Sequence, residues 1–339
     1  MIARVTLLEP DGTCREGTAT ALGDGRLVLG PEADTAVPRL PGLVARGLTD
    51  HHVHLHLLDA EALRAGALLR GGLRRVVDLG GDPATLTDLR VPGALPGTTV
   101  LHSGAFLTAP GGYPVDRDWA PAATYRELTG PEEAAPVVAE MAAAGASAVK
   151  IAANAAAGPL LGDDTHRAVV AAARTRGLPV VVHAEGPGVV SHVARLGVDR
   201  FAHTPHSEVL PADLVEYLAG STTWISTLDI HGWGDPTTEH GIAVENLRRF
   251  HTAGGIVRYG TDLGNGPLPL GLDTREIEGL HAAGLDAAAV FAALSPAPFT
   301  EDDPPGTPAV WLPRASPTHA DVTGAERLTA AILEGETHR

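Results

Sequence analysis

Lysine is almost missing from this chain. Lys150 is the only lysine among 25 basic residues, so arginine carries every other positive side-chain charge. A bias toward arginine codons explains the missing lysines, but it does not explain why one lysine remains. Arginine stays protonated in proteins, whereas a buried lysine amine can lose its proton and react. Lys150 is therefore a candidate for amine chemistry if its neighbours support that role.

Cysteine and long apolar runs are also scarce. The single cysteine, Cys14, excludes an internal disulfide and a cysteine-based metal site, as expected in the reducing cytoplasm. No apolar run reaches the roughly 18 residues of a membrane span, and the N-terminus lacks the pattern of an export signal. The formal net charge of −16 disfavours binding to nucleic acid or to anionic lipid. We expect a soluble cytoplasmic protein that acts on a small molecule, with no nucleic-acid or membrane partner.

Most of the chain alternates between short apolar runs and helical stretches rich in alanine and leucine. This alternation over roughly 250 residues predicts a closed parallel (β/α)₈ TIM barrel. An open doubly wound sheet is the structural alternative, but it gives no reason for polar residues to recur where the strands end. The eight predicted strands lie within residues 43–55, 74–81, 98–104, 146–153, 179–186, 198–204, 221–229 and 255–262.

The two ends of the chain have a different pattern. Residues 1–43 contain short strand-like runs separated by turns, and two further strand-like runs, PAVWLP and TAAILEG, follow a proline-rich stretch near the C-terminus. We predict that residues 1–43 and 305–339 together form a small β-sandwich-like domain. Residues 44–304 then form the barrel domain.

The first barrel strand ends in TDHHVHLHL, which is a candidate metal site. Alternation along a strand places Asp50, His52, His54 and His56 on one face. Two imidazoles on one face can chelate a divalent ion, although a lone His-x-His is only moderately specific.

Four more polar residues lie at or near the ends of other predicted strands. In a parallel barrel the C-terminal ends of the strands meet on one face, where active sites form. Four imidazoles and a carboxylate suit zinc, although other divalent ions remain open. The four residues are Lys150, His183, His203 and Asp262.

These motifs resemble those of a known family. The run PGLVARGLTDHHVHL resembles the first-strand signature of the amidohydrolase superfamily, and the lysine, two later histidines and the GTD aspartate follow in that superfamily's order. The segments HSGAFLTAPGG and HAEGPGVVSHVARLGVDRFAHTPH are more similar to the imidazolonepropionase and prolidase-like branch. The resemblance extends over roughly residues 40–290.

The resemblance implies a metal-dependent amidohydrolase with two divalent ions, most simply zinc. His52, His54 and Asp262 would hold one ion, and His183 and His203 would hold the other. Lys150, carboxylated by CO₂ to a carbamate, would bridge the two ions. A metal-activated hydroxide would then hydrolyse the C–N bond of an amide, a dipeptide-like substrate or a cyclic amide. Asp262 would accept the proton of the water and pass it to the leaving nitrogen.

Substrate contacts are less well defined by the sequence. The candidates are Tyr113, Asn154, His206 and His231. Tyr113 stands where the prolidase-like pattern has histidine, so the resemblance does not define the substrate. Arg258 could neutralise a substrate carboxylate, but an ion pair in the floor of the barrel is the preferred interpretation. Barrels of this type commonly pair, so a homodimer is an open expectation.

Three alternatives use the same residues differently. A mononuclear cyclic amidase, similar to imidazolonepropionase, would leave Lys150 only hydrogen-bonded. An isomerase, lyase or decarboxylase could use the same metal centre without hydrolysis. A catalytically silent metal-binding protein ranks last, because Asp262 and all the other expected positions are present.

Overall fold

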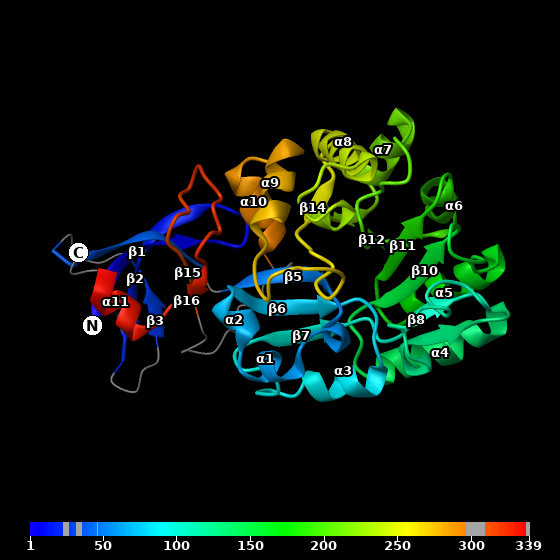
Figure 1. The fold of residues 1–339 in the computed structure, drawn as a ribbon, viewed down its shortest axis with the longest axis horizontal. Helices are drawn as coiled ribbons and strands as arrows, with labels where there is room; N and C mark the ends of the chain where they lie inside the picture. Colours follow the sequence, from blue (N-terminus) through cyan, green and yellow to red (C-terminus); the bar gives the residue numbers. More distant parts are fainter. Residues whose placement is uncertain (23–26, 32–35, 46, 296–308, 337–339) are drawn as a thin grey trace.

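The computed structural model describes residues 1–22, 27–31, 36–45, 47–295 and 309–336. Figure 1 shows a larger body of strands and helices with a smaller β-sheet beside it at one end. No helix in these residues is long and apolar enough to cross a membrane. The TAAILEG run, residues 329–335, lies outside the larger body. The candidate site lies inside the larger body.

Two parallel sheets form the centre of the larger body. The three-stranded sheet has the order β5-β6-β7, and the seven-stranded sheet has the order β14-β13-β12-β11-β10-β8-β9. Each of the eight predicted strand regions contains one of these strands. Their bounds are β5 Leu48–Val53, β6 Leu73–Asp78, β7 Thr99–His102, β8 Phe106–Thr108, β9 Tyr125–Glu127, β10 Val149–Asn154, β11 Val180–Glu185, β12 Arg200–Phe201, β13 Thr223–Ile225 and β14 Ile256–Arg258.

Backbone hydrogen bonds join the two sheets at both edges. The amide of His54 donates to the carbonyl of Leu263 at 2.7 Å, which links β5 to the segment after β14. On the other side the amide of Ser147 donates to the carbonyl of His102 at 2.8 Å, which links β10 to β7. The parallel strands therefore form a barrel-like ring.

Helices follow the strands and pack around this ring. Several begin at an aspartate or threonine whose side chain accepts a hydrogen bond from the first turn, for example Asp82 before α3 and Asp286 before α10. The helices are α1 Ala60–Arg64, α2 Ala67–Arg70, α3 Pro83–Leu89, α4 Ala134–Ala143, α5 Asp163–Arg174, α6 Val189–Leu196, α7 Ala212–Ala219, α8 Thr238–Thr252, α9 Thr274–Ala282 and α10 Ala287–Leu294, with 3₁₀ turns η1 Leu55–Leu57, η2 Ala122–Thr124, η3 Pro131–Glu133 and η4 Asp229–His231.

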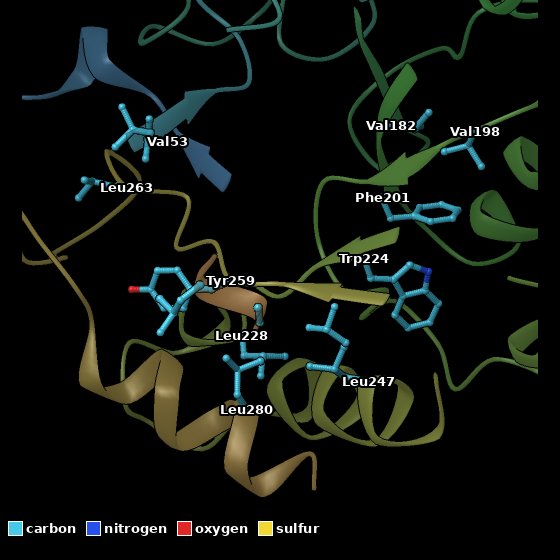
Figure 2. Close-up of a cluster of buried hydrophobic side chains, with 14 of the residues drawn as sticks. Val53, Val182, Val198, Phe201, Trp224, Leu228, Leu247, Tyr259, Leu263 and Leu280 are labelled. Atoms are coloured by element: carbon cyan, nitrogen blue, oxygen red, sulfur yellow. The ribbon is translucent and has the colours of Figure 1, made fainter. Parts of the chain in front are cut away.

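The main apolar core lies between the ring and these helices. Trp224 on β13 stacks on Phe250 of α8, with ring centroids 3.9 Å apart. Tyr259 is fully buried, and its hydroxyl accepts a hydrogen bond from the amide of Asp273 at 2.8 Å. Figure 2 shows Trp224 and Tyr259 among the aliphatic side chains of this cluster. This packing holds β13 and β14 firmly, and both lead into loops of the candidate site.

The smaller sheet contains segments from both ends of the chain. Its six strands have the order β16-β15-β4-β1-β2-β3. The PAVWLP run contains a strand of this sheet, as predicted. The bounds are β1 Ile2–Leu8, β2 Cys14–Ala21, β3 Leu27–Gly30, β4 Arg39–Ala45, β15 Val310–Leu312 and β16 Glu326–Arg327.

The prediction of a strand in TAAILEG was wrong. These residues lie in helix α11, which spans Ala330–Glu336. Alanine, leucine and glutamate have high helix propensity. Leu333 is fully buried in the apolar cluster of the smaller sheet, so this helix covers the sheet and does not extend it.

Candidate metal centre

Five of the six predicted metal ligands lie in the C-terminal half of a barrel strand or in the residues that follow it, whereas Lys150 is the second residue of β10 and not at its C-terminal end as predicted. The six ligands come from five strands or the residues that follow them: β5, β10, β11, β12 and β14. Each residue is buried, with at most 8% of its surface exposed. All six line one cavity of about 200 Å³, namely His52, His54, Lys150, His183, His203 and Asp262.

Asp262 lies at the centre of the cluster. His52 Nε2 and His54 Nε2 are each 3.1 Å from Asp262 Oδ1, and the two nitrogens are 3.3 Å from one another. Among the described residues, Asp262 Oδ1 accepts no hydrogen bond of good geometry although it is buried. Potential ligand atoms of His52, His203 and Asp262 all lie within 4.8 Å of one another. Two imidazole nitrogens and one buried carboxylate oxygen facing the same point fit a divalent ion.

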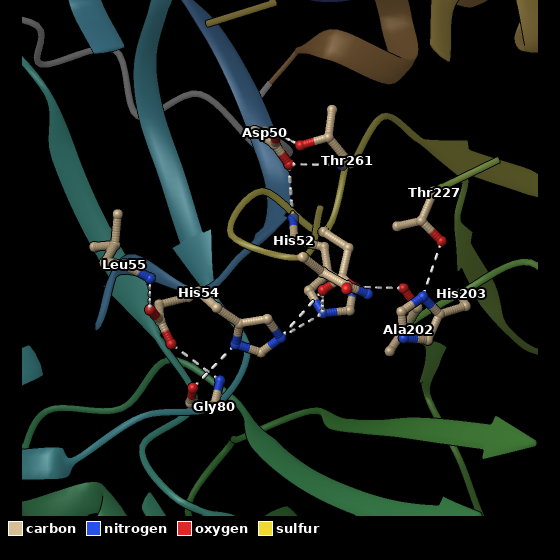
Figure 3. Close-up of polar contacts among 12 residues, drawn as sticks. Asp50, His52, His54, Leu55, Gly80, Ala202, His203, Thr227 and Thr261 are labelled. Carbon is tan, nitrogen blue, oxygen red and sulfur yellow. Dashed lines mark hydrogen bonds and ion pairs between the residues drawn. The ribbon is translucent and has the colours of Figure 1, made fainter. Parts of the chain in front are cut away.

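The outer nitrogens of three imidazoles are held by oxygen atoms, which turns the other nitrogen into the cavity (Figure 3). Partners of this kind fix the tautomer and orientation of metal-binding histidines. In each case an Nδ1 lies within hydrogen-bond distance of an oxygen. The pairs are His52 with the Ala202 carbonyl at 2.7 Å, His54 with the Gly80 carbonyl at 3.0 Å and His203 with the Thr227 hydroxyl at 2.9 Å.

The protonation states of His52, His203 and Asp262 also suit metal binding, whereas the Asp262 carboxylate raises the pKa of His54 although burial opposes that shift. Burial lowers the pKa of His52 and of His203 well below the usual value, so both imidazoles are neutral near pH 7. Burial alone would raise the pKa of Asp262, but the adjacent His52 and His54 hold it well below the usual value. Asp262 also has a φ of 57°, in the left-handed region that few non-glycine residues adopt. Its side chain is therefore an ionised acceptor, and its backbone is strained.

Lys150 lies under this cluster on β10. Its surface is 1% exposed, and Nζ is 5.8 Å from the centre of the Phe106 ring. Burial lowers the pKa of the amine from 10.5 to about 7, although the carboxylates of Asp262 and Asp78 oppose the shift. A substantial fraction of the side chain is consequently unprotonated at neutral pH, as a reaction with CO₂ requires.

Glu185, which the sequence analysis did not single out, lies two residues after His183 on β11. Its Oε2 is 3.0 Å from His183 Nε2 and accepts a hydrogen bond from Asn154 Nδ2 at 2.7 Å. The His183 ring therefore faces Glu185 through this nitrogen, and it also stacks on Tyr113 with centroids 5.1 Å apart. Only the shared strand parity of residues 183 and 185 could have indicated Glu185 in advance.

The four predicted substrate residues separate into two groups. Tyr113, His206 and His231 line the cavity, and the rings of the two histidines have centroids 4.1 Å apart. Asn154 is not among the residues that line it, because its side chain is turned toward Glu185. Four lining residues were not predicted: Phe106, Glu185, Ile230 and Asn265.

A second cavity of about 240 Å³ adjoins the first. Both are lined by His54, Tyr113, Asp262 and Asn265. The second also has Trp119 in its wall, whose ring lies 6.0 Å from Tyr113 and 6.3 Å from His54, centroid to centroid. Tyr113 and Trp119 both belong to the connection between β8 and β9. That connection therefore forms an aromatic wall of the site.

Two buried aspartates fix the backbone around the histidines. Asp50 accepts hydrogen bonds from the amide of His52 at 2.9 Å and from the hydroxyl of Thr261 at 2.5 Å, which joins the first strand to the segment carrying Asp262. Asp78 accepts from the amides of Leu55 at 2.7 Å and Gly80 at 3.0 Å. Neither aspartate is among the residues that line the cavity, so both support the backbone around the ligands. Figure 3 shows Asp50 beside Thr261 and His52.

Known proteins resemble this chain in structure more than in sequence. A scan against family models finds no match, and a search of curated proteins finds none either. The barrel-like fold and the buried His/Asp cluster, which could hold a metal ion, first define a class, that of barrel-like enzymes whose candidate site lies toward the C-terminal ends of the strands.

Solved structures then show which enzymes share the fold. A candidate prolidase from Bifidobacterium longum is 27% identical over 87% of this chain and 81% of its own, with a TM-score of 0.66. Ochratoxinase from A. niger is 18% identical over 92% and 89%, with a TM-score of 0.72. A Xaa-Pro dipeptidase with bound methionine is 18% identical over 86% of each chain, with a TM-score of 0.68. The chain therefore has the fold of amidohydrolase-superfamily enzymes that act on C–N bonds.

Proposed function

We propose that the chain is a metal-dependent amidohydrolase that hydrolyses the C–N bond of an amide, a dipeptide-like substrate or a cyclic amide. The observation that carries the proposal is the meeting of Lys150, Asp262 and four histidines in one buried cavity. The candidate prolidase, at 27% identity, supports the dipeptide-like class in particular.

We assign a binuclear centre to these residues. His52, His54 and Asp262 would hold one ion, His183 and His203 the other, and a carbamate on Lys150 would bridge them. The buried Oδ1 of Asp262, which lies 3.1 Å from His52 Nε2 and from His54 Nε2, and the lowered pKa of Lys150 support this assignment. The nitrogen and oxygen donors suit zinc. The carbamate forms when the neutral Lys150 amine attacks the carbon of CO₂ and loses one N–H proton to solvent.

Divalent metal at this site would lower the pKa of a water molecule and polarise the carbonyl of the substrate. Asp262 accepts the proton of that water, because its carboxylate is ionised and buried, and donates it to the leaving nitrogen. Tyr113, His206 and His231 contact the substrate from the cavity wall. Asn154 acts indirectly, through its hydrogen bond to Glu185.

The shape of the site favours a substrate with an apolar or aromatic group. Leu57, Tyr113 and Trp119 line the second cavity, and none of the arginines in the described part of the chain lines either cavity to pair with a substrate carboxylate. We expect Trp119→Ala to raise KM about tenfold for an amide that carries a phenyl group and to change KM little for an acetamide. The two substrates assayed side by side make this comparison, and equal effects on both would contradict the assignment of the second cavity.

The central experiment measures the number of metal ions per chain and the mass of the peptide that contains Lys150. We expect about two zinc ions per chain by elemental analysis, and the added mass of one CO₂ on the peptide containing Lys150. Lys150→Ala should lose one ion and most turnover of an amide panel, and added acetate should restore part of both by supplying a carboxylate. Arg64→Gln, a change at an exposed residue on α1, is the control. Two ions and full turnover in Lys150→Ala would contradict the proposal.

One contact favours a mononuclear cyclic amidase as a second candidate. His183 Nε2 lies beside Glu185 at 3.0 Å, and His183 is not part of the group of three residues whose ligand atoms are within 4.8 Å. One ion per chain, no added mass on Lys150 and turnover of cyclic amides would identify this function.

We also propose that the smaller sheet is a separate β domain built from residues 1–43 and 305–339, with residues 44–304 as the catalytic domain. Its own apolar cluster, which includes Val5, Leu40 and Trp311, supports this division.

A further inference from the structure

Two loops at the C-terminal end of the barrel contain residues with strained backbone. They follow β13 and β14, at residues 226–237 and 259–273. Among the described residues, the three non-glycine residues with a left-handed φ all lie in these loops: Thr227 at 43°, Trp233 at 49° and Asp262 at 57°. Such conformations persist only where the surrounding contacts hold them, and they are concentrated at functional sites. The contacts between the two loops therefore bear on the position of Asp262.

Asn265, which lines both cavities of the site, holds the side chain of Asp262. Its Nδ2 donates a hydrogen bond to Asp262 Oδ2 at 2.9 Å, and its backbone amide donates to the carbonyl of Asp262 at 2.9 Å. The other carboxylate oxygen, Oδ1, lies 3.1 Å from His52 Nε2 and from His54 Nε2. The two oxygens of Asp262 consequently face different partners, and Asn265 fixes which oxygen is turned toward the histidines.

Trp233 extends from the loop after β13 and contacts Asn265. Its indole Nε1 donates a hydrogen bond to the backbone carbonyl of Asn265 at 3.3 Å. The indole also lies directly against Gly266, where an added Cβ would be 2.2 Å from Trp233 Nε1. Since Gly266 has a φ of 90° and no room for a side chain, only glycine fits this contact. Trp233 therefore joins the loop after β13 to the loop that carries Asp262.

Helix α9 anchors the loop that carries Trp233. Arg275 Nε donates to Asp229 Oδ1 at 2.9 Å, and the amide of Asp229 donates to Glu276 Oε2 at 2.8 Å. The carbonyl of Asp229 in turn accepts a hydrogen bond from the amide of Trp233 at 2.7 Å. A continuous set of contacts therefore leads from α9 through Trp233 to Asn265.

We propose that Asn265 is a positioning residue for Asp262 and that Trp233 acts through Asn265. This inference rests on the proposed function, because it concerns the carboxylate that would bind metal and accept the proton of water. A carboxylate oxygen has two lone pairs, so Oδ2 can accept a hydrogen bond from Asn265 and still receive a proton. With Oδ2 held, rotation of the carboxylate is restricted and Oδ1 stays directed toward the histidines. Partners of metal ligands commonly orient their ligands in this way.

The test compares Asn265→Ala with Asn265→Gln, which keeps an amide donor. We expect Asn265→Ala to lower kcat for an amide substrate about 10–100-fold and to change KM less than about twofold, because it alters the reacting carboxylate and not substrate binding. Asn265→Gln should recover part of this loss. Zinc affinity, measured by competition with a chelator, should fall in the same order. The visible absorption spectrum of the cobalt-loaded protein should change in Asn265→Ala.

A second pair of variants tests the contact with Trp233. Trp233→Phe keeps an aromatic ring against Gly266 and removes the N–H, and loss of one hydrogen bond predicts a fall in kcat of about fivefold. Trp233 is 42% exposed, so this variant stays a test even if Asn265→Ala does not fold. In Asn265→Ala, adding Trp233→Phe should have no further effect, because the side chain that transmits it is absent. Tyr217→Phe, at an exposed ring on α7, is the control with unchanged kcat and zinc affinity.

The outcomes distinguish this inference from the proposed function. A rise in KM at unchanged kcat in Asn265→Ala would show that Asn265 contacts the substrate and would overturn the inference. Wild-type kinetics and zinc affinity in Asn265→Ala, or additive effects in the double variant, would also overturn it. If the wild type binds zinc but hydrolyses no amide, the proposed function fails, and zinc affinity and the cobalt spectrum still decide the role of Asn265. A wild type that binds no divalent metal would overturn both.

Discussion

The two ends of the barrel interior differ in charge although the same strands form both. At the C-terminal end, Asp262 and four histidines surround the amine of Lys150. At the N-terminal end, Arg75, Arg200 and Arg258 line a cavity of about 170 Å³ together with His51 and several apolar side chains. Residues a few positions apart in the chain thus lie in different surroundings, as Arg258 and Asp262 illustrate. An apolar layer that includes Val77, Val181 and Ile225 lies between the two ends.

The largest expected effect is on kcat, and it distinguishes the C-terminal end of the barrel interior from the N-terminal end. Asp262→Asn should lower kcat for an amide substrate by about 1,000-fold, because it removes a general base that also serves as a metal ligand. Arg200→Gln should change kcat by less than about twofold, since it lies beyond the apolar layer. Steady-state kinetics with metal-loaded protein measures both. Asp286→Asn, which preserves a helix cap on the surface, is the control.

A buried carboxyl beside the metal-centre end provides a pH test. Burial raises the pKa of Glu276 on α9 from 4.5 to about 8, so the folded chain holds a proton there that the unfolded chain releases. The free energy of unfolding should therefore fall as pH rises from about 5 to 8. Glu276→Gln should remove this loss and be more stable than wild type at pH 9 by on the order of 3 kcal/mol.

Urea unfolding at several pH values measures the effect. The exposed neighbour on the same helix, in Glu278→Gln, should follow the wild-type profile. A Glu276→Gln profile with the wild-type slope between pH 5 and 8 would show that Glu276 is ionised in the folded chain.

A smaller effect is expected at Glu185, which lies within hydrogen-bond distance of His183. Glu185→Gln should reduce zinc affinity or kcat about 10–100-fold, because partners of metal ligands have effects of this size. Asn154→Ala, one step further away, should have a weaker effect in the same direction. Metal titration with a competing chelator compares the two variants with Glu61→Gln on the surface of α1. A stronger effect of Asn154→Ala would mean that Asn154 contacts the substrate directly.

The strands and the candidate ligands were predictable because they depend on short patterns. Each predicted strand region contains a strand, and a parallel barrel necessarily brings the ends of its strands together. Lys150 and Asp262 could be placed in one cavity from their positions alone. The roles of these residues as ligands and catalysts stay predictions.

Residues whose importance depends on a distant partner were not predictable. Asp50 gains its role from Thr261, which is 211 positions away, and Asn154 forms a hydrogen bond with Glu185, which is 31 positions away. The role of Asn154 at the substrate stays a prediction. The helix at TAAILEG was missed because a short apolar run satisfies the pattern of a strand as well as that of a buried helix turn.

The sequence by itself determined the order of the strands, the polar residues at their ends and the single lysine among arginines. The strands and the polar residues at their ends can be recognised from the alternation of side chains over a few residues, and the single lysine from the composition. Only the tertiary structure decided that Lys150 is buried enough to lose its proton and that Asp262 Oδ1 faces the imidazoles of His52 and His54. It also decided that three arginines share one cavity below the apolar layer. Desolvation and charge proximity depend on which distant segments pack together, and the closing of the barrel determines that packing.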